Sequence, residues 1–99
     1  MTEKKFRNDR FITRGIADNL NPLLVMLLWE MIDSMLVAQD YLQVFNLSGE
    51  DGKQKIEHIR EVPQYKREYL LDAGTPIFYG KIFVIDDEIH STMLLASEY

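Results

Sequence analysis

The side chains best suited to chemistry stand close together near the C-terminus, where the acidic run DDE at 86–88 is followed by His90. A carboxylate can orient and charge a histidine for acid–base catalysis, and carboxylates with an imidazole can also hold a metal ion. A structural reading competes with both, because Asp side chains often accept hydrogen bonds from the backbone of a turn. One hypothesis is therefore a small hydrolase or metal-dependent enzyme that uses Asp86, Asp87 and His90, but the short spacing favours a capped turn.

Metal binding has little support elsewhere in the chain. Zinc prefers nitrogen or sulfur ligands, but the chain has no cysteine, and its only histidines, His58 and His90, would have to meet in space. A calcium loop of the EF-hand type is longer than the run at 86–90 and needs a central glycine that this run lacks. The segment GTPIFYGK at 74–81 has the wrong spacing for a phosphate-binding loop and leads into a strand-like sequence. We expect neither a metal nor a cofactor.

Aromatic and basic side chains gather in the middle of the sequence, among them Tyr65, Arg67, Tyr69 and Tyr79. Aromatic rings between cations are typical of single-strand nucleic-acid binding, whereas Tyr and Arg are also enriched at protein interfaces, and aromatic rings fill cores. The net charge of −5 argues against binding to phosphate backbones, whose affinity comes largely from Lys and Arg. A protein interface is therefore favoured, and a nucleic-acid-binding accessory protein stays as an alternative.

The longest apolar run is PLLVMLLWEMIDSMLVA at 22–38, and its spacing predicts a long helix. We expect the rest of the fold to be built around this helix. Asn21 before Pro22 is the pattern of a helix start, with a capping side chain followed by proline at the first helical position. The first two turns are apolar all round, which indicates burial in a core or against a partner.

A narrow polar stripe interrupts the second half of this predicted helix. Glu30 and Asp33 lie near the middle of a run that is already shorter than a bilayer requires, so we do not expect a membrane span. Leu23 and Met26 fall on the side of the stripe, where a loop, the aromatic segment 64–79 or another copy of the chain must cover them. If they are bare, they mark a partner site.

Runs of β-branched and aromatic residues predict strands around this helix. We expect strands at 10–16, 41–47, 53–62 and 77–86, with a hairpin turn at Asp51-Gly52. The near-continuous apolar sequence at 82–85 indicates a central strand that is buried on both faces. Residues 64–72 fit a short helix or an extended segment, and residues 91–98 fit a capped helix or, as we favour, a strand folded back after the turn at 86–88.

The predicted fold class is therefore α+β, with one long helix packed on an antiparallel sheet of four or five strands. The 99 residues allow a single domain, which we place at 10–99 after a disordered basic N-terminus at 1–9. The chain lacks cysteine, and its basic N-terminus is not followed by an apolar segment of signal-peptide length, so we expect a cytoplasmic protein.

Several segments resemble one known family. With RFITRGI, YLQVFNL and especially KIFVIDD followed by HSTMLLASEY, the chain from Arg10 to Tyr99 resembles the bacterial family catalogued as domain of unknown function 960. The resemblance implies a compact cytosolic bacterial protein. It implies no activity and assigns no role to any residue.

The sequence as a whole favours a non-enzymatic protein-binding or adaptor domain. The chain is rich in large apolar and aromatic side chains and has no convincing catalytic set, so we expect contact with a protein partner or with a second copy in a homodimer. The contact would use a sheet edge or an exposed aromatic surface. The candidate partner-binding residues are Leu23, Met26, Tyr65, Arg67, Tyr69 and Tyr79.

Overall fold

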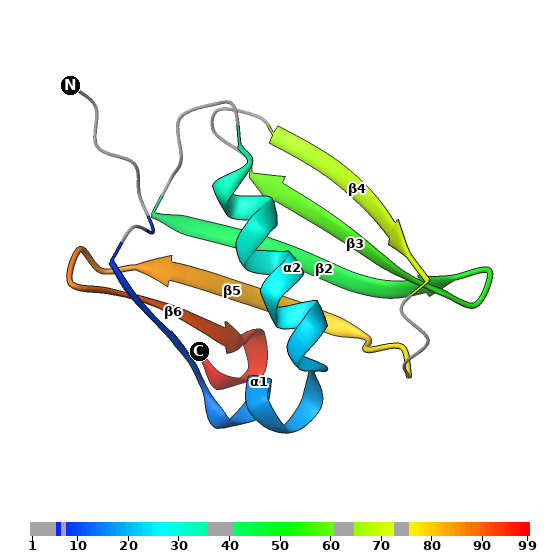
Figure 1. The fold of residues 1–99 in the computed structure, drawn as a ribbon, viewed down its shortest axis with the longest axis horizontal. Helices are drawn as coiled ribbons and strands as arrows, with labels where there is room; N and C mark the ends of the chain where they lie inside the picture. Colours follow the sequence, from blue (N-terminus) through cyan, green and yellow to red (C-terminus); the bar gives the residue numbers. More distant parts are fainter. Residues whose placement is uncertain (1–5, 7, 36–40, 61–64, 73–75) are drawn as a thin grey trace.

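Two helices lie against one face of a six-stranded sheet (Figure 1). The computed structural model describes residues 6, 8–35, 41–60, 65–72 and 76–99. In chain order the elements are β1 (Asp9–Ile12), α1 (Arg14–Asn19), α2 (Pro22–Asp33), β2 (Leu42–Glu50), β3 (Lys53–Arg60), β4 (Tyr65–Leu71), β5 (Gly80–Asp86), β6 (His90–Leu95) and the short 3-10 turn η1 (Ala96–Glu98).

The strand order across the sheet is β1-β6-β5-β2-β3-β4. All neighbouring pairs are antiparallel except β1 and β6, which run parallel with Asp9 opposite His90. The α+β class is confirmed, but the prediction of four or five antiparallel strands is wrong, because the sheet has six strands and is mixed. The parallel pair joins the two ends of the chain, a long-range contact for which neither local sequence carries a signal.

The core lies between the helices and the face of the sheet that they cover. Both helices and four strands contribute to one cluster of buried apolar side chains, which comprises Phe6, Ile16, Leu20, Leu24, Leu28, Met31, Ile32, Phe45, Leu47, Ile56, Ile82, Val84 and Met93. On the strands these residues alternate with more exposed ones, as the period of two requires.

Helix α2 begins where the sequence predicts. The Oδ1 atom of Asn21 accepts a hydrogen bond from the backbone N–H of Leu23 at 2.7 Å, and proline occupies the first turn. The helix ends earlier than predicted, at Asp33, because the Ser34 hydroxyl bonds back to the Met31 carbonyl and closes the last turn. Residues 36–38 of the predicted helix lie outside the described part of the chain, so the described helix has 12 residues.

The strand predicted at 10–16 is wrong beyond Ile12, because a short helix follows there. Strand β1 ends at Ile12, and Thr13 then caps the short helix α1 by accepting a hydrogen bond from the Ile16 N–H. Ile16 and Leu20 are four residues apart and both enter the core, which is the helical signal that the strand reading overlooked.

The two predicted hairpins are present. Asp51 and Gly52 both adopt positive φ angles, 52° and 76°, in the tight turn between β2 and β3. Strand β6 folds back antiparallel onto β5, with Val84 opposite Met93. β5 lies between β6 and β2, as expected of a central strand.

Strand β4 decides between the short helix and the extended segment that the sequence allows at 64–72. It pairs antiparallel with β3 at the edge of the sheet, with Glu57 opposite Glu68 and Tyr69 opposite Ile56. The local sequence suits either conformation, so the hydrogen-bonding groups offered by β3 decide between them.

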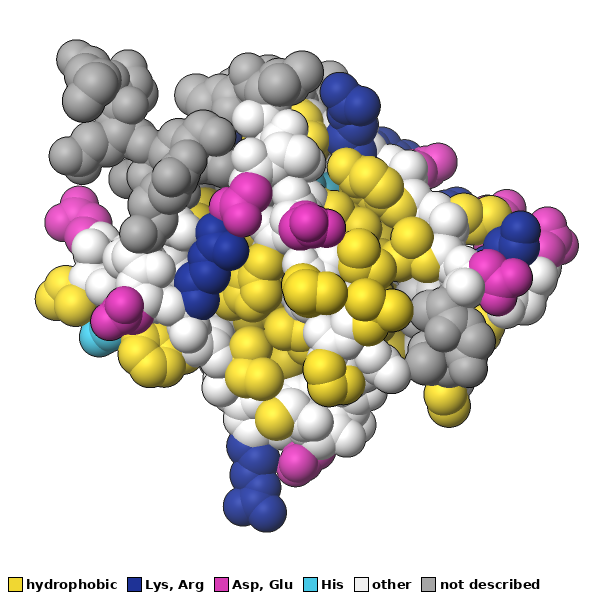
Figure 2. Space-filling view, viewed as in Figure 1, with side chains coloured by type: hydrophobic (Ala, Val, Ile, Leu, Met, Phe, Trp, Pro, Cys, Tyr) yellow, Lys and Arg dark blue, Asp and Glu magenta, His cyan; other side chains and the backbone are white. Residues whose placement is uncertain are grey.

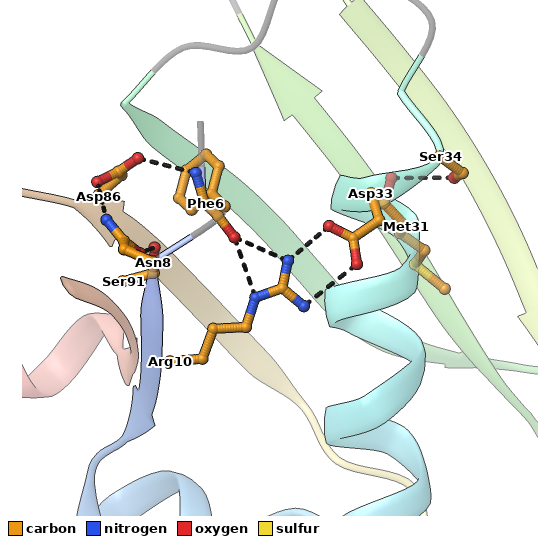
Figure 3. A network of polar contacts seen from close by, with 8 residues as sticks. All are labelled: Phe6, Asn8, Arg10, Met31, Asp33, Ser34, Asp86 and Ser91. Atoms are coloured by element: carbon orange, nitrogen blue, oxygen red, sulfur yellow. Dashed lines mark hydrogen bonds and ion pairs between the residues drawn. The ribbon is translucent and has the colours of Figure 1, made fainter. Parts of the chain in front are cut away.

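The N-terminal segment is fastened to the fold by polar contacts that begin before β1 (Figure 3). Phe6 is fully buried, although 1–9 was predicted to be disordered. The Arg10 guanidinium donates to the Phe6 carbonyl and forms an ion pair with Asp33 of α2 at 2.5 Å. It also lies 4.7 Å from the centre of the Trp29 ring, so one side chain joins β1 to two turns of the helix.

No helix in the described residues is long and apolar enough to cross a membrane.

Candidate protein-binding surface

The outer side of α2 exposes large apolar side chains. Leu23 is 46 % exposed and Met26 is 55 % exposed, whereas Leu24 and Leu28 on the opposite side of the helix are buried. The first two turns of the helix are apolar all round, which predicted burial in a core or against a partner. In the structure the helix packs against the sheet on one side only. In Figure 2 apolar side chains gather across the middle of this face of the molecule, over α2 and its surroundings.

An open groove of about 570 Å³ runs between α2 and the edge strand β4. Leu27 and Met31 of the helix form one wall, and Tyr69 and Leu71 of the strand form the other. The groove exists because a helix is about 10 Å wide whereas six strands span about 24 Å, so a single helix leaves the β4 side of the sheet without cover.

The polar stripe of α2 forms the rim of this groove. Glu30, Asp33 and Ser34 all line it. Asp33 is neutralised by Arg10, but Glu30 has no ion-pair partner among the residues that the structure describes. The groove therefore combines apolar walls with the negative charge of Glu30 at its edge, which no described residue neutralises.

Three of the six predicted partner-binding residues lie on the exposed side of α2 or line the groove, and Arg67 lies two residues from Tyr69 on β4. Leu23 and Met26 stand on α2, and Tyr69 lines the groove. Arg67 is exposed on β4 and is paired with His58, which places its side chain on the helix side of the sheet. The strand alternation that puts Tyr69 into the groove thus puts Arg67 on the same face.

The other two predicted residues lie apart from the groove. The Tyr65 ring meets the His58 ring edge-on at 5.1 Å and lies 5.9 Å from the Arg60 guanidinium, so it covers buried polar groups. Tyr79 is exposed ahead of β5, where its hydroxyl lies across Gly49 so closely that a Cβ there would come within 2.5 Å of it.

The acidic turn of the proposed enzyme site is engaged in holding the backbone. Asp86 is buried and accepts hydrogen bonds from the backbone N–H of Phe6 and of Glu88, each at 2.8 Å, and from the Asn8 amide at 2.9 Å. Figure 3 shows that Asp86 and Asn8 point toward each other. This carboxylate ties the N-terminal segment to the β5–β6 turn.

Asp87 and His90 form a local cap in the same turn. Asp87 accepts hydrogen bonds from the backbone N–H of His90 at 2.8 Å and of Ile89 at 3.0 Å, and it lies 3.2 Å from the His90 ring. The hydrogen bonds from His90, chiefly from its backbone, hold the pKa of Asp87 below its usual range. This is the capped turn that the spacing favoured.

His58 is placed far from this turn. It lies on β3, three strand positions or about 14 Å across the sheet from β6, and its row reaches β6 at Leu95, about 17 Å along the strand from His90. Among the described residues no group of three or more metal-ligating side chains lies together.

His58 is buried and closely packed. The ring is fully buried, stacks on Phe45 with centroids 4.4 Å apart, and its Nε2 lies 2.7 Å from the Oε1 atom of Gln43. Burial, aided by the nearby charge of Arg60, lowers the pKa of His58 from 6.5 to about 4. A neutral, packed ring with no access to solvent is a core residue.

Sequence reasoning identified the stripe and the exposed pair but missed the second wall of the groove. The sequence at 64–72 fits either a helix or a strand, so it does not place Leu71, and the apolar pattern of the helix predicts only burial for Leu27 and Met31. A strand reading of YKREYLL would have put Tyr65, Tyr69 and Leu71 on one face.

A family model described as "Staphylococcal protein of unknown function (DUF960)" matches residues 9–98. The chain belongs to the DUF960 family. This confirms the resemblance carried by the C-terminal segments. A crystal structure described as that of "the protein of unknown function from Enterococcus faecalis" is similar to this DUF960 protein over 99 % of this chain and 98 % of that chain, with a TM-score of 0.88 and 24 % identity. At this identity the likeness concerns the fold alone. No curated protein matches the chain.

Proposed function

We propose that this DUF960 protein is a non-enzymatic protein-binding or adaptor domain of the bacterial cytoplasm, and that it binds its partner on the surface formed by α2 and the α2–β4 groove. The observation that supports this most strongly is the exposure of Leu23 and Met26 on a helix whose opposite side forms part of the core. Isolated apolar residues on a surface are ordinary, but Leu23 lies one helical turn from Leu27, which lines an apolar groove.

The groove has the dimensions and lining of a site for a short apolar segment. Two elements line the groove with flexible and aromatic side chains, namely Leu27, Met31, Tyr69 and Leu71. Such a lining can accommodate apolar side chains that a partner inserts from the solvent side. An amphipathic helix laid beside α2 would complete the cover of the sheet on the β4 side. The carboxylate of Glu30 at the rim favours a Lys or Arg next to the apolar side chains of the partner.

The proposal is tested by comparing proteins retained from a staphylococcal lysate by three forms of the immobilised chain. These are the wild type, the double variant Leu23→Ser/Met26→Ser, and the control Ile89→Ser, which removes an exposed apolar side chain from the distant β5–β6 turn. We expect the wild type and the control to retain the same protein and the double variant to lose it.

Two outcomes would refute the proposed surface. Retention of the same set by all three forms would show that α2 does not contribute, and the absence of any specifically retained protein would remove the adaptor role. Because Leu23 and Met26 are largely exposed, the double variant is expected to keep the fold, which circular dichroism can check.

A further inference from the structure

The sheet has a second apolar surface, on the face turned away from the viewer in Figure 1. Its centre is a row of side chains that runs across four strands, because Leu94 is paired with Phe83, Phe83 with Val44, and Val44 with Ile59. Directly paired residues share a face, so these four side chains form a continuous strip.

The neighbouring row extends the strip. Ile85 is paired with both Leu42 and Thr92, and Thr92 is paired with Phe11 on the edge strand β1. Phe11 is 50 % exposed. We call the two rows together the open-face patch; its members are Phe11, Leu42, Val44, Ile59, Phe83, Ile85, Thr92 and Leu94.

The described helices do not cover this patch, since α1 and α2 both belong to the core on the opposite face. An antiparallel sheet with one solvated face normally alternates apolar and polar residues. β5 breaks that rule, because the outward-pointing Phe83 and Ile85 are as apolar as the buried Ile82 and Val84 with which they alternate. The sequence of β5 is typical of a strand that is buried on both faces. In the structure its outward face, with Phe83 and Ile85, is only partly buried.

The last residue of the chain stands on the same patch. The ring of Tyr99 meets Phe83 edge-on with centroids 5.5 Å apart, and Tyr99 is still 82 % exposed. A tyrosine that offers most of its ring to solvent beside an apolar strip is typical of an interface residue.

Charged residues on the far half of this face balance one another. Lys55 is linked to Glu50 and Glu57, and Lys66 to Glu57 and Glu68, at N–O distances from 3.4 to 4.0 Å. This ladder has no strong net charge that would select a nucleic acid or a highly charged protein. A surface that carries both signs in near balance can face a copy of itself without net repulsion.

We infer that two copies of the chain associate through their open faces, sheet against sheet, in a symmetric dimer. The face measures roughly 500 Å² in projection, from five strand spacings and about seven residues of strand length. The relief of the side chains brings its accessible area toward the roughly 800 Å² per partner of a standard interface. Packing would bury Val44, Phe83 and Ile85 in a second core and leave α2 and its groove free on the outside.

The test is the oligomeric state, measured by sedimentation velocity at concentrations up to about 100 µM. We expect the wild type to be a dimer. Val44→Glu places an unpaired charge at the centre of the patch and should raise the dissociation constant at least about 100-fold. Met26→Glu adds the same charge on the α2 side and should leave the dimer unchanged.

A second variant guards against the chance that Val44→Glu disturbs folding. Tyr99→Ala removes a ring that is mostly exposed, so the fold is retained, and the dissociation constant should rise on the order of tenfold. A wild type that stays monomeric would overturn the inference. So would a dimer that resists both Val44→Glu and Tyr99→Ala, or one that is lost in Met26→Glu, because the interface would then lie elsewhere. The proposed partner surface on α2 is tested separately, since its readout is retention of a foreign protein.

Discussion

Acidification should weaken the fold through a single buried group, His58. The Oε1 atom of Gln43 can only accept a hydrogen bond, so Nε2 of His58 carries the hydrogen of the neutral ring. A second proton would go to Nδ1, which is buried and has no hydrogen-bond partner among the described residues. Because Arg60 is also close, the folded protein disfavours the charged imidazolium, and its pKa falls to about 4.

The sign and size of the effect follow from proton linkage. The unfolded chain binds a proton at His58 with a pKa near 6.5, but the folded protein does so only near 4, so between these values the unfolded state binds more protons. The free energy of unfolding is therefore fully maintained above about pH 7 and declines as the pH falls through this window. The loss due to His58 is about 1 kcal/mol by pH 5.5 and about 2 kcal/mol by pH 5.

Urea denaturation followed by the fluorescence of the only tryptophan, Trp29, measures this loss between about pH 7.5 and pH 5.5. The lower limit stays above the isoelectric point of about 4.9, where the protein would be least soluble. The hydrogen bonds that lower the pKa of Asp87 and Glu98 make both groups titrate below this range.

The two histidines provide a matched pair of variants. His58→Gln keeps an amide that can donate to Gln43 but removes the titrating ring, so its stability should be nearly independent of pH in this range. His90→Gln, at the exposed second histidine, should keep the full decline of the wild type. The reasoning is refuted if His58→Gln retains the decline, or if NMR shows the His58 ring titrating near pH 6.5.

Four further substitutions test the packing and the backbone by urea denaturation. Leu28→Ala should cost about 3 kcal/mol because it leaves a cavity, while Leu23→Ala on the exposed side of α2 should cost less than about 1 kcal/mol; equal costs would contradict the assignment of the two sides. Asp86→Ala should cost about 2–4 kcal/mol because two backbone N–H groups lose their acceptor, and a neutral result would show that water replaces the carboxylate. Gly52→Ala should cost about 1 kcal/mol because the turn holds this residue at a φ of 76° although the space around it is open, and a gain in stability would exclude backbone strain there.

Features that depend on a few neighbouring residues could be predicted from the sequence. Asn21 caps α2 because its side chain reaches an N–H two residues away, and the Asp51-Gly52 turn forms because both residues tolerate positive φ. The turn at 86–88 could be predicted for the same reason, since Asp87 accepts hydrogen bonds from backbone N–H groups two and three residues away.

Features that depend on distant strands could not be predicted in the same way. The segment YKREYLL becomes β4 because β3 offers a free edge, and β1 runs parallel to β6 because residues about 80 positions apart in the chain meet. The groove could not be predicted for the same reason, since one of its walls is β4 and the other is α2.

The sequence by itself determined the start of α2, the turns of both hairpins and the apolar character of the helix and of β5. Only the tertiary structure decided which apolar residues are covered. Leu23 and Met26 stay exposed because α2 packs on the sheet with its other side, and the groove stays open because α2 is too narrow to reach across β4. The outward row of Val44 and Phe83 stays open because both helices lie on the opposite face of the sheet. The hydrophobicity of a side chain indicates that it favours burial. How the helices pack on the sheet decides whether residues of this chain or of another one bury it.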